Sequence, residues 1–242
     1  MRRARIVGLG IALILATAGC MPQPGTVEGR DISALYTGFL IAAAVVAAVV
    51  LVPLTWSIVR HRRGRDPSLP TQHRGNLRLE IAWTIVPALL VAGLFVGTLV
   101  VLGRVDRPDA AAPTQIDVTA FRWGWSFRYP ATGLVQSGVG DPGPEVVVPI
   151  GTPIRLTLTS NDVIHSFYVP LFLFKRDLNP GRENVVEFTV DQAGTYRGQC
   201  AEYCGFQHYR MPFTVRAVSQ TEFASWLAST TAAQAGGATS VR

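Results

Sequence analysis

The chain has 242 residues, of which 48% are hydrophobic and only 16% are charged, whereas soluble domains average about 25% charged residues. So much apolar sequence excludes an intrinsically disordered protein and favours a membrane-associated one. The net charge of +6 comes from residues 1–103, which hold ten Arg against four acids; residues 104–242 hold eleven Arg, one Lys and twelve acids and are neutral. Nucleic-acid binding requires a basic face on a folded domain, so this distribution excludes it.

Residues 1–19 have the features of a secretory signal peptide of the lipoprotein type. Three arginines within the first five residues precede a short apolar stretch, Ile6–Ala18. Two small residues then lead into Cys20, an ending similar to a lipoprotein cleavage box, although Thr17 stands where Leu is usual. We therefore predict lipidation of Cys20 after cleavage. An uncleaved signal or a free cysteine is the alternative.

Two long uncharged runs follow, at residues 32–59 and 81–103. At 1.5 Å per residue, 28 and 23 residues each exceed the roughly 30 Å hydrocarbon core of a bilayer. Pro53 and Pro87 would break helices in water, but membrane helices tolerate proline. The runs predict two transmembrane helices. A buried helical hairpin of a soluble protein fits uncharged runs of this length less well.

The loop between these runs, residues 60–80, predicts how the chain crosses the membrane. It carries six arginines, whereas the flanks beyond the two runs are nearly neutral. Positive loops remain in the cytoplasm, so residues 104–242 are expected on the outer side of a bacterial plasma membrane, in agreement with the signal peptide. His61 and His73 also lie in this loop. They lack the neighbouring Cys or acidic residues of a metal site and are predicted to be solvated.

Beyond an Ala/Pro linker, residues 114–218 change to short β-rich runs separated by turn residues, which predicts an all-β sandwich or barrel. Ser219 and Glu222 form a capping box that opens a short helix, and the remainder of residues 219–242 is expected to be a flexible tail. The predicted strands are 115–121, 145–150, 154–160, 184–190 and 212–218.

The segment Cys200–Met211 concentrates metal-binding side chains. Within twelve residues it holds the thiols of Cys200 and Cys204, the imidazole of His208 and the thioether of Met211. Thiolates, thioethers and imidazoles together select soft metals, copper above all. His165 lies 35 positions before Cys200, at the end of a predicted strand, and a sandwich can bring that edge against this segment.

Three simpler interpretations of these side chains compete with a copper site. A disulfide between Cys200 and Cys204 suits an oxidising compartment but leaves the His and Met residues unexplained. A structural zinc site with two Cys and two His fits the spacing but leaves Met211 unused. A mononuclear blue-copper site needs one Cys rather than two. Two thiolates spaced by three residues can instead bridge a pair of metal ions, with one His completing each ion.

Five stretches of the chain carry a family resemblance: L-E-I-A-W-T-I-V-P-A (79–88), F-R-W-G-W-S-F-R-Y-P (121–130), N-D-V-I-H-S-F (161–167), F-K-R-D-L-N-P-G-R (174–182) and G-Q-C-A-E-Y-C-G-F-Q-H-Y-R-M-P (198–212). On these stretches the chain resembles subunit II of the haem-copper cytochrome c oxidases, which bears the binuclear copper A centre. The resemblance runs from about residue 32 to residue 228. It implies two transmembrane helices followed by a cupredoxin-like Greek-key sandwich.

The resemblance also implies a role for each metal-binding residue. Two thiolates bridge both coppers, each imidazole binds one copper, and a thioether and a backbone carbonyl are weak ligands of one copper each. The carboxylate of Glu202, pointing away, would join a magnesium site shared with subunit I. The bridging thiolates are those of Cys200 and Cys204, and the imidazoles are those of His165 and His208. The weak ligands are the thioether of Met211 and the backbone carbonyl of Glu202.

Two further residues receive roles from the resemblance. Trp123 matches the aromatic residue through which electrons arrive from cytochrome c. Strand alternation puts it on one face with three other aromatic residues, of which Trp125 and Phe127 are expected in the core. Gly124, where many family members carry Tyr, would leave room for a partner. Glu80 matches the carboxylate at the mouth of a proton path into subunit I; without the resemblance it would be an interface residue.

The resulting prediction is subunit II of a respiratory oxidase. It would accept electrons one at a time from cytochrome c and pass them to haem in subunit I, where oxygen is reduced to water with proton translocation. The expected partners are subunit I with its haem and copper B, subunit III, and a soluble or membrane-bound cytochrome c. The neutral outer domain lacks the usual acidic docking face, beyond Asp162 and scattered acids. A membrane-tethered copper carrier is the rival, although a carrier needs an open site.

Overall fold

The computed structural model describes residues 22–61, 72, 75–106 and 112–239. The described part of the chain divides into two compact units, one formed by the membrane helices from Ala34 to Leu102 and the other by the chain from Gly103 onward together with residues 22–33. The predicted signal peptide, Cys20, His73 and much of the arginine-rich loop lie outside the described residues.

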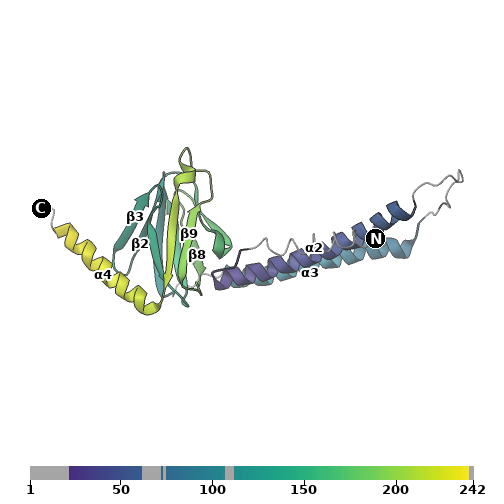
Figure 1. The fold of residues 1–242 in the computed structure, drawn as a ribbon, viewed down its shortest axis with the longest axis horizontal. Helices are drawn as coiled ribbons and strands as arrows, with labels where there is room; N and C mark the ends of the chain where they lie inside the picture. Colours follow the sequence, from purple (N-terminus) through teal and green to yellow (C-terminus); the bar gives the residue numbers. More distant parts are fainter. Residues whose placement is uncertain (1–21, 62–71, 73–74, 107–111, 240–242) are drawn as a thin grey trace, which may run out of the picture. The chain divides into compact units, whose positions relative to one another are not determined.

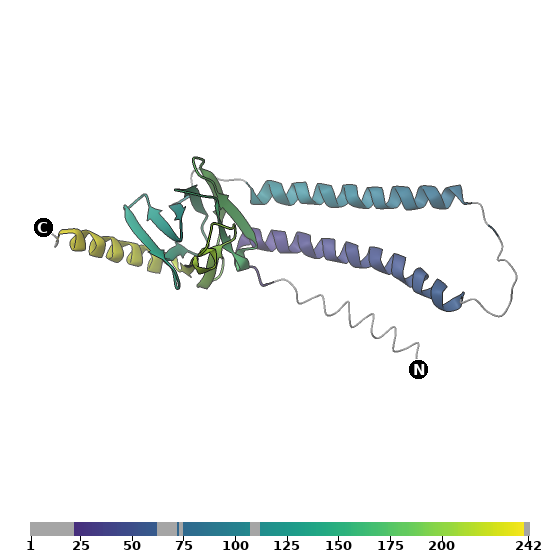
Figure 2. The ribbon, with the colours of Figure 1, turned by 90° about the horizontal axis from the view of Figure 1, so that it is seen from above.

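Each predicted membrane span lies inside one long helix, α2 (Val27–Arg60) or α3 (Leu77–Val105) (Figure 2). The most apolar 18-residue stretch of each helix has a mean hydropathy of 2.6 in α2 and 2.7 in α3, and none of that stretch is buried within the chain. Both helices are therefore long and apolar enough to cross a bilayer. They begin before the apolar runs because Thr26 caps α2 and Asn76 caps α3, with side-chain oxygens 2.9 and 3.3 Å from backbone N–H nitrogens of the first turn.

The outer domain contains two five-stranded sheets (Figure 1). The first has the strand order β3-β2-β1-β5-β8, and the second has the order β4-β10-β9-β6-β7. β1 runs parallel to β5 and β10 parallel to β4, whereas the other pairs are antiparallel. The strands are β1 (Thr114–Phe121), β2 (Gly124–Tyr129), β3 (Leu134–Val139), β4 (Glu145–Pro149), β5 (Ile154–Ser160), β6 (His165–Val169), β7 (Phe174–Leu178), β8 (Asn184–Phe188), β9 (Gly194–Cys200) and β10 (Pro212–Val218).

The predicted fold class, two apolar helices followed by an all-β domain, is confirmed. The five predicted strands are present, and β2, β3, β6, β7 and β9 add to them. The aromatic run at 121–127 is not one strand but a hairpin, in which Arg122 and Trp123 form the turn between β1 and β2. The alternation assumed across that whole run is therefore wrong, although Trp125 and Phe127 are fully buried in the core.

An aromatic cluster forms the part of the core nearest the segment Cys200–Met211. The ring centroids of Trp125 and Phe213 are 5.0 Å apart, and those of Phe167 and Phe213 are 4.7 Å apart. The indole Nε1 of Trp125 donates a hydrogen bond to the backbone carbonyl oxygen of Met211 at 3.1 Å. The core thereby anchors the end of the segment that carries the candidate ligands.

The residues that precede the first span belong to the outer domain, which sequence analysis does not predict. The backbone N–H of Gly25 donates to the carbonyl of Leu171 (2.7 Å), and that of Val27 donates to the carbonyl of Thr189 (3.0 Å). Thr26 between them is fully buried. This segment therefore completes the outer domain beside the end of β8.

Helix α4 (Gln220–Thr239) begins at the predicted capping box but extends further than expected. Trp226 packs against Tyr129 with ring centroids 5.5 Å apart. The side-chain amide of Gln234 exchanges two hydrogen bonds, of 3.1 and 3.0 Å, with the backbone of Val135 on the edge strand β3. Sequence analysis predicts a flexible tail here. The helix continues instead because its residues include many Ala, the strongest helix former, and because this contact holds it.

Candidate metal centre

Three candidate ligands come from the ends of neighbouring strands in the second sheet, and the others lie on the segment between β9 and β10. His165 opens β6, Cys200 ends β9, and Met211 immediately precedes β10. The backbone N–H of Cys200 donates to the carbonyl oxygen of Met211 at 3.2 Å and closes the loop between them. Strand pairing of β6, β9 and β10 thus brings together residues that are 35 and 11 positions apart in the sequence.

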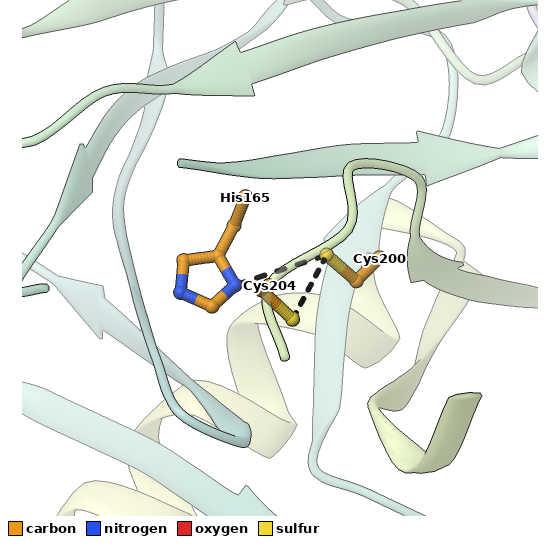
Figure 3. A group of neighbouring side chains, drawn as sticks. All are labelled: His165, Cys200 and Cys204. Carbon is orange, nitrogen blue, oxygen red and sulfur yellow. Dashed lines mark hydrogen bonds between the residues drawn. The ribbon is translucent and has the colours of Figure 1, made fainter. Parts of the chain in front are cut away.

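The inner part of the group consists of His165, Cys200 and Cys204 (Figure 3). The two Sγ atoms lie 4.0 Å apart, and His165 Nδ1 lies 3.8 Å from Cys200 Sγ. One donor atom from each residue lies within 4.8 Å of the others, and all three residues are buried. Both cysteines are free thiols, and their separation is far from the roughly 2.05 Å of a disulfide.

Three more donors surround the same two sulfurs. His208 Nδ1 lies 3.5 Å and Met211 Sδ 3.8 Å from Cys204 Sγ. The backbone carbonyl oxygen of Glu202 lies 3.3 Å from Cys200 Sγ. The structure therefore brings together all six positions that the resemblance implies as ligands, and both sulfurs have one imidazole beside them.

Electrostatics in the group favour one thiolate before any metal binds. Burial opposes ionisation of Cys200, but its hydrogen bond with His165, its backbone hydrogen bonds with Ser166 and Glu202 and the charge of His165 together outweigh burial and lower the pKa of the thiol. The pKa of His165 is raised despite burial, through hydrogen bonds with Cys200 and Asp162. Burial and the neighbouring Cys200 raise the pKa of Cys204 to about 12. A metal that binds both thiolates must therefore displace a proton from Cys204.

Trp123 lies against the loop that carries Cys204 and His208. A Cβ atom placed on Gly205 would lie 3.4 Å from Cζ2 and 3.5 Å from Nε1 of the Trp123 indole. The indole is half-buried, and its Nε1 has no hydrogen-bond partner among the described residues. The structure therefore places Trp123 beside Gly205, the residue that follows Cys204 in the sequence.

The expectation that Gly124 leaves room for a partner is wrong. Gly124 is buried, and a Cβ atom at this position would collide with the carbonyl oxygen of Gly138 on β3 and with side-chain atoms of Val139 and Phe121. A glycine is needed here because the neighbouring strand passes too closely for any side chain. Access to Trp123 therefore does not come from Gly124.

Two carboxylates with predicted roles lie away from the sulfurs. The carboxylate of Glu202 forms an ion pair with Lys175 of β7, so it points outward while its backbone carbonyl points to Cys200. Glu80 lies exposed in the first turn of α3, in the other unit. His61 follows the end of α2 and is exposed.

Sequence reasoning missed two features of the site. Tyr203, Phe206 and Tyr209 are 80%, 82% and 77% exposed on the loop between Cys200 and Met211. Large aromatic side chains gathered on an exposed loop are typical of protein–protein contact surfaces. The other missed feature is a contact of Asp162, which sequence analysis considers only as a docking acid: its carboxylate accepts a hydrogen bond from the ring of His165. The only sequence signal for it was its place three residues before the histidine.

The fold and this site define a membrane-anchored protein with an outer cupredoxin-like domain. Residues 115–218 match the family profile described as the periplasmic domain of cytochrome c oxidase subunit II, and residues 17–99 match the profile of its transmembrane domain. The chain therefore belongs to the cytochrome c oxidase subunit II family, as the resemblance implied. It is a subunit of an oxidoreductase, located in a membrane with its C-terminal domain on the outer side.

Two relatives agree with this assignment by sequence. The probable cytochrome c oxidase subunit 2 of Streptomyces coelicolor is 34% identical, over 92% of this chain and 85% of that protein. Cytochrome c oxidase subunit 2 of Mycobacterium tuberculosis is 29% identical, over 94% and 81% of the two chains. The crystal structure of the periplasmic domain of subunit II from Bradyrhizobium japonicum is 37% identical, covers 51% of this chain and 95% of that chain, and has a TM-score of 0.47.

Proposed function

We propose that this chain receives electrons from cytochrome c for a haem-copper oxidase, through a binuclear copper A centre. Cys200 and Cys204 would bridge two coppers, and His165 and His208 would bind one each. Met211 and the Glu202 carbonyl would be the weaker ligands. When bound, the copper pair supplies one-electron redox chemistry between the donor and haem in subunit I, where oxygen is reduced to water with proton translocation.

The observation that carries this proposal is the convergence of all six donors on two thiols. A zinc site would use two Cys and two His as ligands and would not use the sulfur of Met211. That sulfur nevertheless lies 3.8 Å from Cys204 Sγ. Thioether and thiolate together favour copper. Three donors lie at the ends of paired strands, the others lie on the segment between β9 and β10, and both thiols are buried, so the chain itself supplies a rigid, water-poor site.

Trp123 would be the side chain through which electrons arrive. Its contact with Gly205, next to Cys204, supports this role. The exposed aromatic side chains of the same loop offer an apolar surface to a partner, and the outer domain has no net charge to attract a basic donor. We therefore expect a cytochrome c, soluble or membrane-bound, that docks through apolar contact more than through charge.

For the remaining residues we propose the roles that the resemblance implies. Glu80 would lie at the entrance of a proton path into subunit I. The carboxylate of Glu202 would bind a magnesium ion shared with subunit I after its ion pair with Lys175 breaks. Subunits I and III would surround α2 and α3, whose apolar side chains are exposed along the spans. Cys20 would be lipidated, which would add an anchor on the outer face of a bacterial plasma membrane.

Purification of the full-length chain from membranes separates this function from a copper carrier. We expect a haem-bearing partner to co-purify, and the complex to consume oxygen with reduced cytochrome c. A Cys204→Ser variant should abolish that activity while the haem remains. A chain that purifies without haem protein and gives up copper readily to a chelator would be a carrier. Burial of the thiols argues against such open exchange.

A further inference from the structure

Asp162 lies between a candidate copper ligand and the turn that carries Trp123. Its Oδ1 atom accepts hydrogen bonds from Nε2 of His165 (2.9 Å) and from the backbone N–H of Val163 (2.6 Å). Its Oδ2 atom accepts from the backbone N–H of Arg122 (2.7 Å), and the Nε of Arg122 lies 3.4 Å away. Each oxygen of this one carboxylate therefore serves a different part of the site.

The contact with His165 decides which ring nitrogen can bind a metal. Nδ1 faces the sulfur of Cys200 at 3.8 Å, whereas Nε2 faces Asp162. A neutral imidazole carries its proton on one nitrogen only, and the carboxylate favours that proton on Nε2. Nδ1 is thereby left free as a ligand and is aimed at the thiols. A metal-bound histidine commonly has its other N–H held by a carboxylate in this manner.

The contact with Arg122 extends the same restraint to the hairpin turn. Arg122 and Trp123 are the two residues between β1 and β2, so a hydrogen bond to the Arg122 backbone fixes the turn itself. On the other side of the turn the Trp123 indole lies against Gly205. The turn is therefore held at two points, by Asp162 and by the loop that carries Cys204.

We propose that Asp162 is a positioning residue that orients His165 for copper and, through Arg122, holds Trp123 against the metal-binding loop. This inference rests on the proposed function, because it presumes copper at the thiols. It differs from a docking role for Asp162, since the carboxylate is only 22% exposed and already paired with Arg122. A docking acid needs a charge that is available to the partner.

Asp162→Asn in the full-length protein tests the contact between Asp162 and His165. Asn keeps the size of the side chain but has one acceptor oxygen for donors on two sides. The copper affinity should fall about 10- to 100-fold, as for comparable carboxylates behind a metal-bound histidine. The visible spectrum and the midpoint potential should also shift. Asp162→Glu, which keeps both oxygens and the charge, should recover part of the affinity.

The matched control is Asp117→Asn. Asp117 also pairs with an arginine of the same hairpin, Arg128, but it contacts no histidine in the described part of the chain. This control should leave copper affinity, spectrum and potential unchanged. If Asp162→Asn behaves like Asp117→Asn and alters only the salt dependence of cytochrome c binding, Asp162 is a docking acid and the inference is wrong.

Arg122→Pro, which lacks the backbone N–H that Asp162 accepts, tests the contact with the turn, and Arg122→Gln, which keeps that N–H, is its control. Arg122→Pro should leave the spectrum and potential as in the wild type, because the His165 contact remains, but should slow stopped-flow reduction by cytochrome c, whereas Arg122→Gln should not. An unchanged rate in a copper-loaded Arg122→Pro protein would overturn this part of the inference. If the wild-type protein itself binds no copper pair, the proposed function fails. If the wild-type protein binds the copper pair but the variants do not differ from it, the inference about Asp162 fails.

Discussion

The indole of Trp123 rests on Gly205, a residue with φ of +121° in the loop between Cys204 and His208. This backbone conformation is open to glycine and strained for other residues. The absence of a side chain at Gly205 also lets the aromatic ring approach the backbone. The two residues therefore depend on each other: the glycine permits the close approach, and the indole covers the loop beside the thiols.

Gly205→Ala should disturb this contact. The positive φ alone should cost about 1–3 kcal/mol of folding free energy. The added Cβ would meet the indole at 3.4 Å, which the ring can accommodate only by a small displacement. Thermal unfolding of the variant should show the loss, and electron transfer from cytochrome c should slow as the ring moves. If Gly205→Ala has the stability and the electron-transfer rate of the wild type, the loop accommodates the added Cβ atom without cost.

Trp123→Gln should slow electron transfer from cytochrome c by a large factor. Copper content, spectrum and midpoint potential should stay unchanged, because Trp123 is not one of the six candidate ligands. The salt dependence of docking should persist, since it arises from charges elsewhere. Stopped-flow reduction is the measurement. If copper is lost and the domain unfolds, Trp123 serves the core, and electrons arrive by another side chain.

Cys204→Ser and Met211→Leu should differ sharply. Serine is a hard, protonated and poor ligand for copper, so Cys204→Ser should remove the shared sulfur and abolish the site. Met211→Leu keeps the volume and loses only the thioether, which should shift the potential and the spectrum while copper stays bound. Metal analysis beside visible spectra distinguishes these outcomes. Equal copper loss in both variants would contradict the proposed roles.

Thr26→Ala tests the segment that precedes the first span. Thr26 is fully buried and accepts a hydrogen bond from the backbone N–H of Gly29 at 2.9 Å. Loss of such a helix cap costs about 1 kcal/mol, up to about 2 kcal/mol. Thr26→Ser, which keeps the hydroxyl, should retain most of the stability. Chemical denaturation of the outer domain reports the difference; equal stability of all three proteins would show that the segment does not support the domain.

The sequence predicted the parts of the protein that have strong local signals. The spans at 32–59 and 81–103 were visible as uncharged runs, and the strands rich in Val and Ile were visible by composition. The hairpin turn at Arg122 and Trp123 was missed because it lies within continuous aromatic sequence without the usual turn residues. The extension of α4 was missed because Gln234 is held by Val135, about a hundred residues away in the chain.

The candidate site was predictable to a similar degree. The spacing of Cys200, Cys204, His208 and Met211 indicated soft-metal chemistry, and the family resemblance supplied the role of each residue. The hydrogen bonds of Asp162 and the contact of the pre-span segment with the outer domain depend on tertiary structure, so no local pattern reveals them. Gly124 shows the opposite error, because a glycine expected to open the surface is enclosed by β3.

The central claim is that two thiolates share two copper ions. It is tested most directly by metal analysis and electron paramagnetic resonance on the purified, oxidised full-length protein. We predict two coppers in this chain and a hyperfine pattern from one unpaired electron shared between both nuclei. A single zinc ion, or one copper with the hyperfine pattern of a single nucleus, would contradict the account.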